Sequence, residues 1–367
     1  MKYYVIAGEA SGDLHGSNLL KEIKLLDTQA QFRCWGGDKM EAQGATLVKH
    51  FRDLAFMGFA EVLMNLRTIL QNISFCKKDI DTWKPDTLIL IDYPGFNLRI
   101  AKWAKAKGLK VIYYISPQVW AWKENRVKMM RECIDLMMVI LPFEKAYFKD
   151  KWNWEVHYVG HPLVRTIDEF VPRIQSFGEK PVVAVLPGSR KQEISVKLPV
   201  MLQVSAHFPQ YQFIVAMAPG TDENFYKPFI AAYPNVICVS GLTYDLLKVA
   251  KGAMVTSGTA TLETALFGVP EVVCYKGNPI SYAIAKRLIT IKYISLVNLI
   301  MDKPVVKELI QHEMNAAALR TELESLLHDQ QRIAGLQADY QKLHEVLSAG
   351  GNASANAANL VWQFMNK

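Results

Sequence analysis

The chain has 367 residues, of which 50% are hydrophobic and 21% are charged. This length exceeds one typical hydrophobic core and predicts two domains, while the composition excludes a largely disordered protein. The apolar residues come in short runs, none near the roughly 20 that a membrane-spanning helix needs, which argues against a membrane-spanning protein.

The cysteines and the start of the chain indicate a compartment. Five cysteines are scattered without a Cys-x₂-Cys pair. This spacing argues against a zinc site or a disulfide framework and fits a reducing cytoplasm. The first residues lead straight into an apolar run and offer no cleavable signal. We therefore expect a cytoplasmic protein.

The net charge of +7 allows three kinds of partner: an anionic small molecule, an anionic membrane surface or nucleic acid. Basic residues cluster at 102–110, 123–131 and 286–292, and the simplest interpretation of each cluster is a solvated helix face. No recognition helix, RNP motif or zinc finger accompanies them. Nucleic acid is therefore the least favoured partner.

The chain opens with a strand, residues 3–7, that ends in glycines, and a helical pattern begins at Asp13. A strand, a tight turn and a helix start are typical of an open α/β sheet, whose ligands bind at the carboxyl ends of the strands. The spacing Gly8-x₃-Gly12-x₃-Gly16 is not the dinucleotide fingerprint. Because Glu9 would repel a pyrophosphate, this loop is a weak candidate for a nucleotide site.

The rest of the first half alternates strands and helices. We expect strands at 31–35, 87–92, 111–115, 136–141 and 155–159, and amphipathic segments at 59–80 and 98–107. The segment 59–80 carries apolar residues at helical spacing, which favours an ordinary core-facing helix. The alternative is an interfacial helix or acyl-chain groove, formed by Val62, Leu63, Leu66, Ile69 and Leu70.

Two loops of the first half are candidates for a site. Asp92 ends a strand and precedes a Pro-Gly turn, a position where α/β enzymes keep catalytic groups, although an Asx-turn explains it equally. After the next strand, residues 113–122 are rich in aromatic side chains that include Trp120. This loop either walls a sugar or lipid site or packs an interdomain face.

A weakly patterned segment, 160–181, reads as a linker, and the cycle then restarts. We expect strands at 181–186, 213–216, 236–239, 253–256 and 271–274, then helices from Pro304 to about Leu347 and a last helix at 353–365. Alternating strands and helices imply parallel sheets, here in two domains whose strand ends face a shared cleft. The predicted domains are 1–165 and 166–345, with residues 346–367 packing back on the first domain or on a partner subunit.

The second half supplies the better phosphate loops. Ser189 and Arg190 follow a strand and a Pro-Gly turn, where a hydroxyl, a guanidinium and free backbone N–H groups make an anion site. Ser257, Gly258 and Thr259 follow another strand and open a helix, whose N-terminus suits a diphosphate. Glu263, one turn further, would repel a diphosphate and better suits a ribose diol, as an acceptor of two hydroxyl donors.

A metal site is not supported by the sequence. Asp79-Ile80-Asp81 has the spacing of a known metal motif, but it lies at a charged helix end, and we expect it to be solvated. No Gly-x-Ser-x-Gly elbow occurs, which argues against a serine hydrolase. We expect neither a metal nor an organic cofactor.

Seven motifs follow one another along the chain: Gly8-Glu-Ala-Ser-Gly-Asp13, Ile91-Asp-Tyr-Pro-Gly-Phe-Asn97, Pro117-Gln-Val-Trp-Ala-Trp122, Leu141-Pro-Phe-Glu144, Leu186-Pro-Gly-Ser-Arg190, Ser257-Gly-Thr-Ala-Thr-Leu-Glu263 and Ser295-Leu-Val-Asn-Leu299. With this combination the chain resembles lipid-A-disaccharide synthases as far as about Leu309. The resemblance implies a GT-B fold, in which two Rossmann-like domains face a central cleft and the second holds a UDP-sugar. It further implies a peripheral place on the cytoplasmic face of the inner membrane.

The implied reaction transfers 2,3-diacylglucosamine from UDP to 2,3-diacylglucosamine 1-phosphate (lipid X) and forms a β-1,6-linked disaccharide. The family commonly carries a second Asp where this chain has Gly95, which leaves Asp92 as the base of that loop. In an inverting displacement Asp92 would deprotonate the acceptor 6-hydroxyl. The residues of the two phosphate loops would then stabilise the leaving UDP in place of a metal.

The remaining site assignments follow from the same hypothesis. Glu263 would hold the ribose, and Asn298 would contact the nucleotide. The opening loop would lie on the acceptor side, with Glu9, Ser11 and Gly12 near Asp92. A homodimer is an open expectation. The alternatives are another UDP-sugar enzyme such as a UDP-sugar 2-epimerase, and a non-catalytic lipid-binding or scaffold protein.

Overall fold

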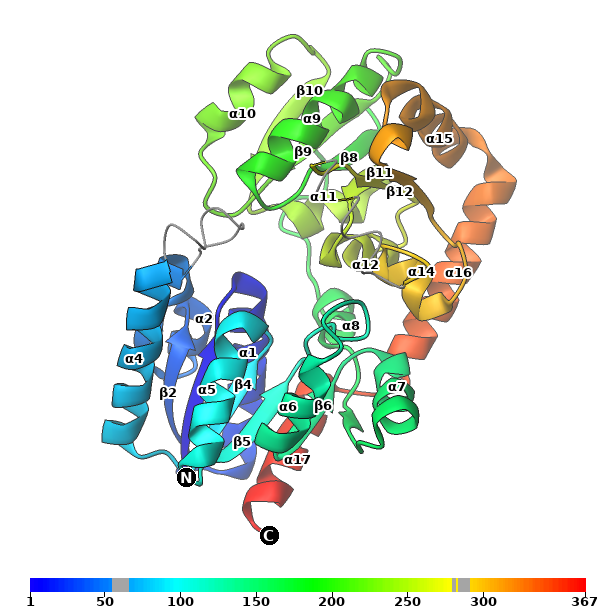
Figure 1. The fold of residues 1–367 in the computed structure, drawn as a ribbon. Coiled ribbons are helices and arrows are strands. Elements are labelled where there is room, and N and C mark those ends of the chain that lie inside the picture. The colour runs from blue at the N-terminus through cyan, green and yellow to red at the C-terminus, as the bar shows by residue number, and fades with distance from the viewer. Residues whose placement is uncertain (55–65, 279–281, 283–290) are drawn as a thin grey trace. The chain divides into compact units, whose positions relative to one another are not determined.

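The computed structural model describes residues 1–54, 66–278, 282 and 291–367, without the side chain of Leu66. The chain divides into two compact units (Figure 1). Unit 1 consists of Met1–Pro162 and Leu347–Lys367, and unit 2 of Leu163–Val346. The chain thus leaves unit 1 once and returns to it at its end.

Unit 1 is built on a parallel sheet that has seven strands within the described residues. In sheet order these strands are β3 (Thr46–His50), β2 (Gln31–Gly36), β1 (Lys2–Ala7), β4 (Thr87–Ile91), β5 (Lys110–Tyr114), β6 (Leu136–Val139) and β7 (His157–Tyr158). Its helices are α1 (Ala10–Leu26), α2 (Asp38–Ala42), α4 (Leu66–Trp83), α5 (Pro94–Ala106), α6 (Arg126–Cys133), α7 (Pro142–Trp152) and α17 (Ala353–Met365), with a 3₁₀ turn η1 (Phe51–Leu54).

Both faces of this sheet are covered by helices, as expected for parallel strands. Tyr4 and Ile6 of β1 face a core shared with α4, α5 and α6. Tyr3 and Val5 of the same strand face the opposite core, which α1 and α17 complete. Successive residues of β1 therefore point into two separate cores, and for this reason the strand is apolar along its whole length.

Unit 2 repeats the architecture with a six-stranded parallel sheet among the described residues. In sheet order its strands are β10 (Val236–Ser240), β9 (Gln212–Met217), β8 (Val182–Leu186), β11 (Ala250–Thr256), β12 (Glu271–Tyr275) and β13 (Lys307–Ile310). The helices of the second half are α8 (Pro162–Asp168, which starts at the last residue of unit 1), α9 (Lys191–Ser205), α10 (Glu223–Ile230), α11 (Thr243–Val249), α12 (Thr259–Leu266), α14 (Leu296–Met301), α15 (Ala316–His328) and α16 (Gln330–Ser348), with a 3₁₀ turn η2 (Gln311–Glu313).

The two parallel α/β sheets confirm the predicted fold class, and two details differ from the sequence prediction. Residues after Pro304 were expected to be helical, but Lys307–Ile310 form β13, and a helix begins only with α15. The edge strand β3 was not predicted at all. Both are short strands at the end of a sheet, where charged side chains interrupt the apolar pattern. No helix within the described ranges is both long and apolar enough to cross a membrane.

Candidate active site

The order of the strands in unit 1 reverses between β1 and β4. From β1 the chain continues to β2 and β3 on one side, and β4 begins the other side. Ligands of open α/β sheets bind at the carboxyl ends of the strands beside such a switch point. The loop with Glu9 and Ser11 follows β1, and Asp92 follows β4 directly. Unit 1 therefore brings these predicted site residues to the same place on its sheet edge.

The backbone at Asp92 is held in an unfavourable conformation. Asp92 and Tyr93 have φ angles of 44° and 48°, in the left-handed region that bulky residues seldom adopt. The carbonyl oxygen of Asp92 accepts hydrogen bonds from Nδ2 of Asn97 at 2.8 Å and from the Tyr113 hydroxyl at 2.6 Å. Asn97 is fully buried. Backbone strain of this kind persists where the surroundings enforce it, and it is frequent at functional sites.

The carboxyl group of Asp92 has an unusual proton affinity. Burial, and to a lesser extent the negative charge of Glu9, raise the pKa of Asp92 to about 7, against a hydrogen bond from the Tyr93 N–H that lowers it. An acid with a pKa near the working pH both binds and releases a proton readily. The position predicted for a general base therefore carries a carboxyl group with a suitable pKa.

The glycines of the opening loop serve close packing. A Cβ atom on Gly8 would lie 2.3 Å from Cγ of Tyr93. A Cβ on Gly12 would lie 3.1 Å from Cβ of Ala7, and one on Gly16 would lie 2.7 Å from the sulfur of Met40. These contacts let α1 and the Tyr93 ring approach β1 closely, which accounts for the glycine spacing without a phosphate. Ser11, by contrast, is exposed.

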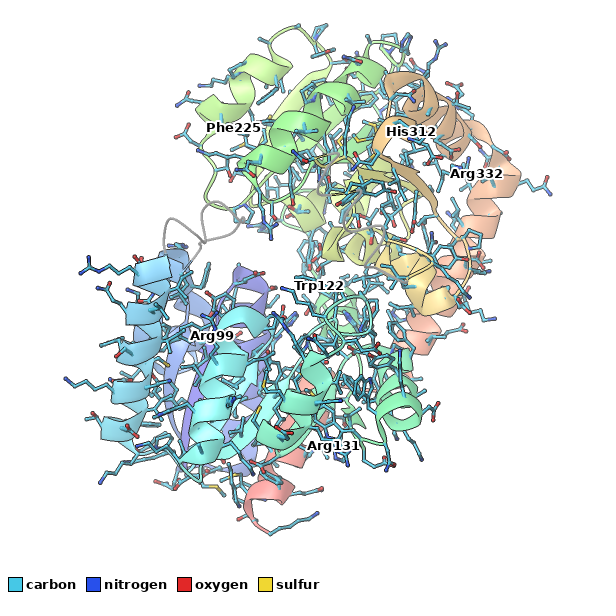
Figure 2. All side chains as sticks on the ribbon, in the orientation of Figure 1. Arg99, Trp122, Arg131, Phe225, His312 and Arg332 are labelled. Carbon is cyan, nitrogen blue, oxygen red and sulfur yellow. The ribbon has the colours of Figure 1, made fainter. Side chains whose placement is uncertain are left out.

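The aromatic loop after β5 contains two tryptophans with different environments. Trp120 is partly buried and meets the ring of Phe143 edge-on, with 5.0 Å between the ring centroids. Trp122 (labelled in Figure 2) is exposed, with 51% of its surface accessible. The ammonium group of Lys123 lies 4.0 Å from the ring centroid of Trp122. Trp120 is therefore the fixed aromatic side chain of this loop.

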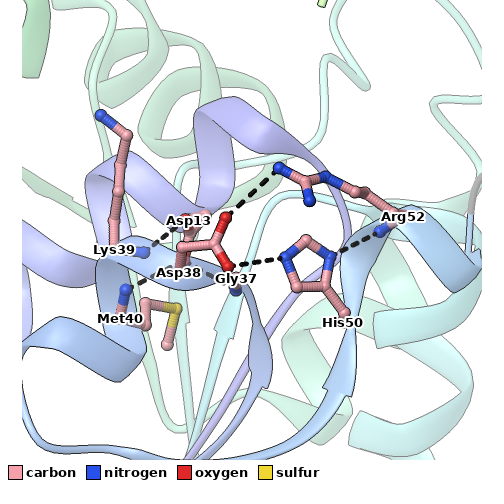
Figure 3. A network of polar contacts seen from close by, with 7 residues as sticks. All are labelled: Asp13, Gly37, Asp38, Lys39, Met40, His50 and Arg52. Atoms are coloured by element: carbon pink, nitrogen blue, oxygen red, sulfur yellow. Dashed lines mark hydrogen bonds and ion pairs between the residues drawn. The ribbon is translucent and has the colours of Figure 1, made fainter. Parts of the chain in front are cut away.

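Asp13, in the same opening motif, has a structural role that the sequence did not reveal. Its carboxylate accepts hydrogen bonds from the backbone N–H groups of Gly37 at 2.8 Å and of Lys39 and Met40 at 3.1 Å (Figure 3). These are the N–H groups at the start of α2, which lack partners within the helix. Asp13 thus caps α2 from a distance and ties α1 to the loop after β2.

Unit 2 has its own switch point, between β8 and β11. Ser189 and Arg190 lie just after β8, and both are exposed. The turn that precedes them contains Gly188 with a φ of 124°, a conformation that favours glycine. Arg190 is the N-cap residue of α9, and its Nη1 lies 3.6 Å from Oε1 of Glu193. The guanidinium group therefore lies beside the start of a helix at the predicted anion site.

A buried lysine lies behind this loop. The Lys197 side chain is 3% exposed, and its Nζ lies 3.9 Å from Oε2 of Glu193. Burial lowers the pKa of Lys197, and the charge of Glu193 opposes this shift. The sequence prediction missed Lys197 because a lysine on an amphipathic helix normally points to solvent.

The second phosphate loop follows β11. Gly258 is the N-cap residue of α12, so the first N–H groups of that helix, including that of Thr259, point out of its start. The Ser257 hydroxyl donates to the Ile294 carbonyl at 2.9 Å, and the Ser257 backbone N–H donates to the Cys274 carbonyl at 3.2 Å. Both donors of Ser257 are used inside unit 2, which leaves the anion contacts of this loop to Gly258 and Thr259.

Glu263 on α12 is hydrogen-bonded to a residue of α11. The Tyr244 hydroxyl donates to Oε1 of Glu263 at 2.9 Å. Burial raises the pKa of Glu263, although this hydrogen bond lowers it. The ring of Tyr244 in turn meets the rings of Phe170 and Phe267 edge-on or tilted. An aromatic cluster therefore fixes the carboxylate that the sequence assigned to a ribose.

Asn298 is held by several hydrogen bonds inside unit 2. Its Nδ2 donates to the Val306 carbonyl and to Oε1 of Glu308, both at 2.9 Å, and its Oδ1 accepts from the Val306 N–H at 2.9 Å. Asn298 is 1% exposed. Both amide hydrogens thus have partners in unit 2, and the contact of Asn298 with a nucleotide stays a prediction. The side chain joins α14 to the segment that leads into β13.

The predicted acyl-binding helix is described only from α4 onward. Val62 and Leu63, and the side chain of Leu66, lie outside the described residues. Ile69 packs against the core, whereas Leu70 is 54% exposed. The described part of this helix therefore has a core-facing side and an exposed apolar side chain on its first turns.

Asp79 on α4 corrects the expectation of a solvated carboxylate. It accepts hydrogen bonds from Nε and Nη2 of Arg33 at 2.8 Å and 2.6 Å and from the Tyr4 hydroxyl at 2.7 Å. The Arg33 guanidinium holds the pKa of Asp79 below its ordinary value, against the effect of burial. Asp79 thus joins α4 to the strands beneath it.

Comparison with known proteins decides the family. The family model of lipid-A-disaccharide synthetase matches residues 3–362. A lipid-A-disaccharide synthase of Geobacter metallireducens is 39% identical over 99% of this chain and 97% of its own length, and that of Syntrophus aciditrophicus is 40% identical over 96% and 95%. The chain belongs to the lipid-A-disaccharide synthase family. It is therefore a glycosyltransferase, as the motifs of its sequence predicted.

Two solved structures resemble the lipid-A-disaccharide synthase fold of this chain at low sequence identity. The glycotransferase of kitacinnamycin has a TM-score of 0.68 at 14% identity, covering 99% of both chains. UDP-GlcNAc 2-epimerase from Neisseria meningitidis, bound to UDP-GlcNAc, has a TM-score of 0.63 at 11% identity, covering all of both chains. They show a shared GT-B fold, which transferases and epimerases have in common. Family membership, not the fold, favours a transferase.

Proposed function

We propose that this protein transfers 2,3-diacylglucosamine from UDP to the 6-hydroxyl of lipid X, with inversion at the anomeric carbon, in lipid A biosynthesis. The observation that carries the mechanism is the carboxyl group of Asp92, which has a pKa of about 7. The backbone of Asp92 is in a strained conformation at the switch point of unit 1. Asp92 takes the hydroxyl proton while the oxygen forms the new bond to the anomeric carbon. The bond from that carbon to UDP breaks, and UDP leaves as an anion.

In this proposal unit 2 binds the donor. Arg190, Ser189 and the N–H groups at Gly258 and Thr259 stabilise the negative charge that develops on the leaving diphosphate. Glu263, fixed by Tyr244, accepts hydrogen bonds from the ribose hydroxyls. Each of these groups lies at the carboxyl end of β8 or β11, or on the first turns of the following helix.

Unit 1 correspondingly binds the acceptor. In this proposal the opening loop after β1, with Glu9, Ser11 and Gly12, and Asp92 after the neighbouring β4 contact the acceptor, and Trp120 supplies an apolar surface. We further propose that the segment of α4 with Leu70 contacts acyl chains. The basic clusters of the sequence would contact anionic lipid on the cytoplasmic face of the inner membrane. Leu70 and Phe75 of α4 are exposed large apolar side chains, which supports this contact. A homodimer is also part of the proposal.

The decisive experiment incubates the purified protein with UDP-2,3-diacylglucosamine and lipid X and detects the disaccharide by mass spectrometry. We expect product from the wild type and a loss of about 10²–10⁴-fold in Asp92→Asn, the usual effect of removing a general base. Full activity of Asp92→Asn would overturn the mechanism. Absence of product from the wild type would overturn the proposed substrates.

Two further measurements test the proposed surroundings. Flotation with liposomes that contain anionic lipid should carry the protein to the top of the gradient, and more weakly at high salt. A UDP-sugar 2-epimerase needs no acyl contact, so the absence of flotation would favour that alternative. Light scattering of the purified protein measures the oligomeric state, and a monomeric mass would overturn the homodimer.

A further inference from the structure

A buried carboxylate of unit 1 has no part in the proposed reaction. Glu144 lies in the first turn of α7, after β6, and is 1% exposed. Its Oε2 accepts a hydrogen bond from the backbone N–H of Leu141 at 2.9 Å. Its Oε1 accepts one from the indole Nε1 of Trp120 at 3.2 Å. The carboxylate thus connects the start of α7 with the aromatic loop after β5.

Capping of α7 alone does not account for this arrangement. A glutamate at this position of a helix commonly bonds back to the backbone, but it does so at the surface, where water solvates its second oxygen. Here burial raises the pKa of Glu144 to about 7, against the hydrogen bonds of Leu141 and Trp120, which lower it. A protein that needed only a cap would do better with an exposed carboxylate. The hydrogen bond from Trp120 therefore indicates that Glu144 does more than cap α7.

Trp120 needs such an anchor. Its loop contains two non-glycine residues in the left-handed region, Ile115 with a φ of 67° and Lys123 with a φ of 55°. The backbone on either side of the indole is therefore conformationally unfavourable, and a β-branched residue at positive φ is a clear outlier. Edge-on packing on Phe143, the residue before Glu144, holds one side of the indole.

The anchored indole lies along the same sheet edge as Asp92. Asp92, Trp120 and Glu144 follow β4, β5 and β6, which are consecutive strands of the sheet. The Tyr113 hydroxyl of β5 donates to the carbonyl of Asp92. The charge of Asp92 also contributes to the raised pKa of Glu144, so the two carboxylates are electrostatically close. A flat apolar indole at this place fits the C–H face of a sugar ring.

We propose that Glu144 is a positioning residue for the acceptor: it locks the Trp120 indole against the start of α7, so that the indole forms a rigid wall for the acceptor sugar beside Asp92. This inference rests on the proposed function, which places the acceptor in unit 1. Glu144 itself touches neither substrate.

The kinetic test uses Glu144→Gln, with Glu132→Gln as a matched control on the exposed surface of unit 1. Gln keeps one accepting oxygen but turns an amide N–H₂ toward the other donor, so one of the two hydrogen bonds is lost. We expect the acceptor KM to rise about tenfold, the usual effect of losing a hydrogen bond to a charged group. The donor KM and the Kd of UDP stay at the wild-type value. Glu132→Gln changes none of the three.

Trp120→Phe tests the same interaction by removing the hydrogen-bond donor instead of the acceptor. This variant leaves the hydrogen bond between Glu144 and Leu141 in place, so α7 keeps its cap, and it remains informative even if Glu144→Gln folds poorly. We expect a similar rise in the acceptor KM. The double variant should show no further rise beyond Trp120→Phe alone, because both changes remove one interaction. Additive effects would overturn the inference.

A spectroscopic measurement separates positioning from catalysis. In protein labelled with 5-fluorotryptophan, the ¹⁹F resonance missing from Trp120→Phe belongs to Trp120. That resonance should shift and broaden in Glu144→Gln and stay unchanged in Glu132→Gln. An unchanged resonance together with an unchanged acceptor KM would overturn the inference in an active enzyme. If the wild type formed no disaccharide, the proposed function would fail and the acceptor role of Trp120 with it, whereas the ¹⁹F shift would still report the anchoring by Glu144.

Discussion

The Asp92 carboxyl group has the proton affinity that a general base needs at neutral pH. Its pKa is raised first by burial and second by Glu9. The reaction requires the ionised form, so kcat/KM should fall as the pH drops below about 7. An ordinary aspartate would keep its activity down to about pH 4.

Glu9→Gln tests the second cause of this shift. Removing the negative charge of Glu9 makes ionisation of Asp92 easier, so the acidic limb of the pH profile should move to lower pH. Burial, the larger cause, is unchanged, so the limb should stay above the ordinary value for aspartate. The measurement is kcat/KM against pH for the wild type, Glu9→Gln and the exposed control Glu132→Gln. A limb at the same pH in all three would show that Glu9 does not act on Asp92.

Arg190 is the exposed cation of the predicted donor site. Arg190→Ala should weaken UDP binding about 10- to 100-fold, the effect of losing a hydrogen bond between charged groups. Isothermal titration calorimetry with UDP measures this without any acceptor. Arg320→Ala removes an exposed arginine elsewhere in unit 2 and is the control. Equal UDP affinity of the two variants would remove Arg190 from the donor site.

At the scale of secondary-structure elements, the contact between the loops after β1 and β4 depends on the absence of a Cβ atom at Gly8. Alanine at Gly8 would place its Cβ 2.3 Å from the Tyr93 ring, which would have to move. We expect Gly8→Ala to lower the free energy of unfolding by about 1–3 kcal/mol through overpacking, and to reduce activity because Tyr93 adjoins Asp92.

Gly95→Ala is the matched control for Gly8→Ala. Gly95 lies in the first turn of α5, and a Cβ there would meet no atom within 4 Å among the described residues. Alanine should therefore raise the free energy of unfolding by about 0.5–1 kcal/mol, as for other helical glycines. Chemical denaturation of both variants gives the two values. Equal destabilisation would contradict the steric explanation.

The elements predicted well from the sequence are those with an unbroken apolar run. Val182–Leu186 and Thr87–Ile91 are fully buried on both faces of their sheets, so every position had to be apolar or small. Lys307–Ile310 begins with two charged residues and lies at the sheet edge, where only part of the strand is buried. Its helix-forming residues gave no local signal for a strand.

The site shows the same division between local and distant information. Asp92 and Arg190 were singled out because a polar side chain directly after a buried strand is a local pattern. The groups that hold the site together are not local in sequence. The Tyr113 hydroxyl bonds to the carbonyl of Asp92, 21 positions away. Tyr244 and Glu144 bond to the side chains of Glu263 and Trp120, 19 and 24 positions away. Such pairs arise only when parallel strands align, so no spacing rule indicates them. Asn298 was singled out as an asparagine in an apolar run, and its hydrogen bonds to the backbone of Val306 could not be foreseen from that pattern.

At the scale of the whole molecule, a buried acid in unit 2 makes stability depend on pH. Glu271 at the start of β12 is 1% exposed, and neither carboxylate oxygen has a hydrogen-bond partner among the described residues. Burial raises the pKa of Glu271 well above its ordinary value of 4.5. The folded protein binds this proton more tightly than the unfolded chain does. Protonation of Glu271 therefore adds fully to the free energy of unfolding below the pKa of the unfolded chain. This contribution is lost as the pH rises through the pKa of the folded protein.

Glu271→Gln tests this dependence. Glutamine cannot ionise, so the Tm of this variant should fall less than that of the wild type as the pH rises above the ordinary glutamate pKa of 4.5. Thermal unfolding monitored by circular dichroism gives both curves, with the exposed Glu132→Gln as the surface control. Parallel curves for the wild type and Glu271→Gln would contradict a protonated Glu271 in the folded protein.

The return of the chain to unit 1 has a consequence for biosynthesis. Ala357, Ala358 and Val361 of α17 fill the core against β1 and α1, yet they are made after all of unit 2. At roughly 5–20 residues per second, a ribosome needs roughly 10–40 s to go from Pro162 to the start of α17. Throughout that interval α1 covers this face of the first sheet without α17, while unit 2 is completed. The hydrophobic core of unit 1 can therefore be completed only after the whole of unit 2 has been synthesised.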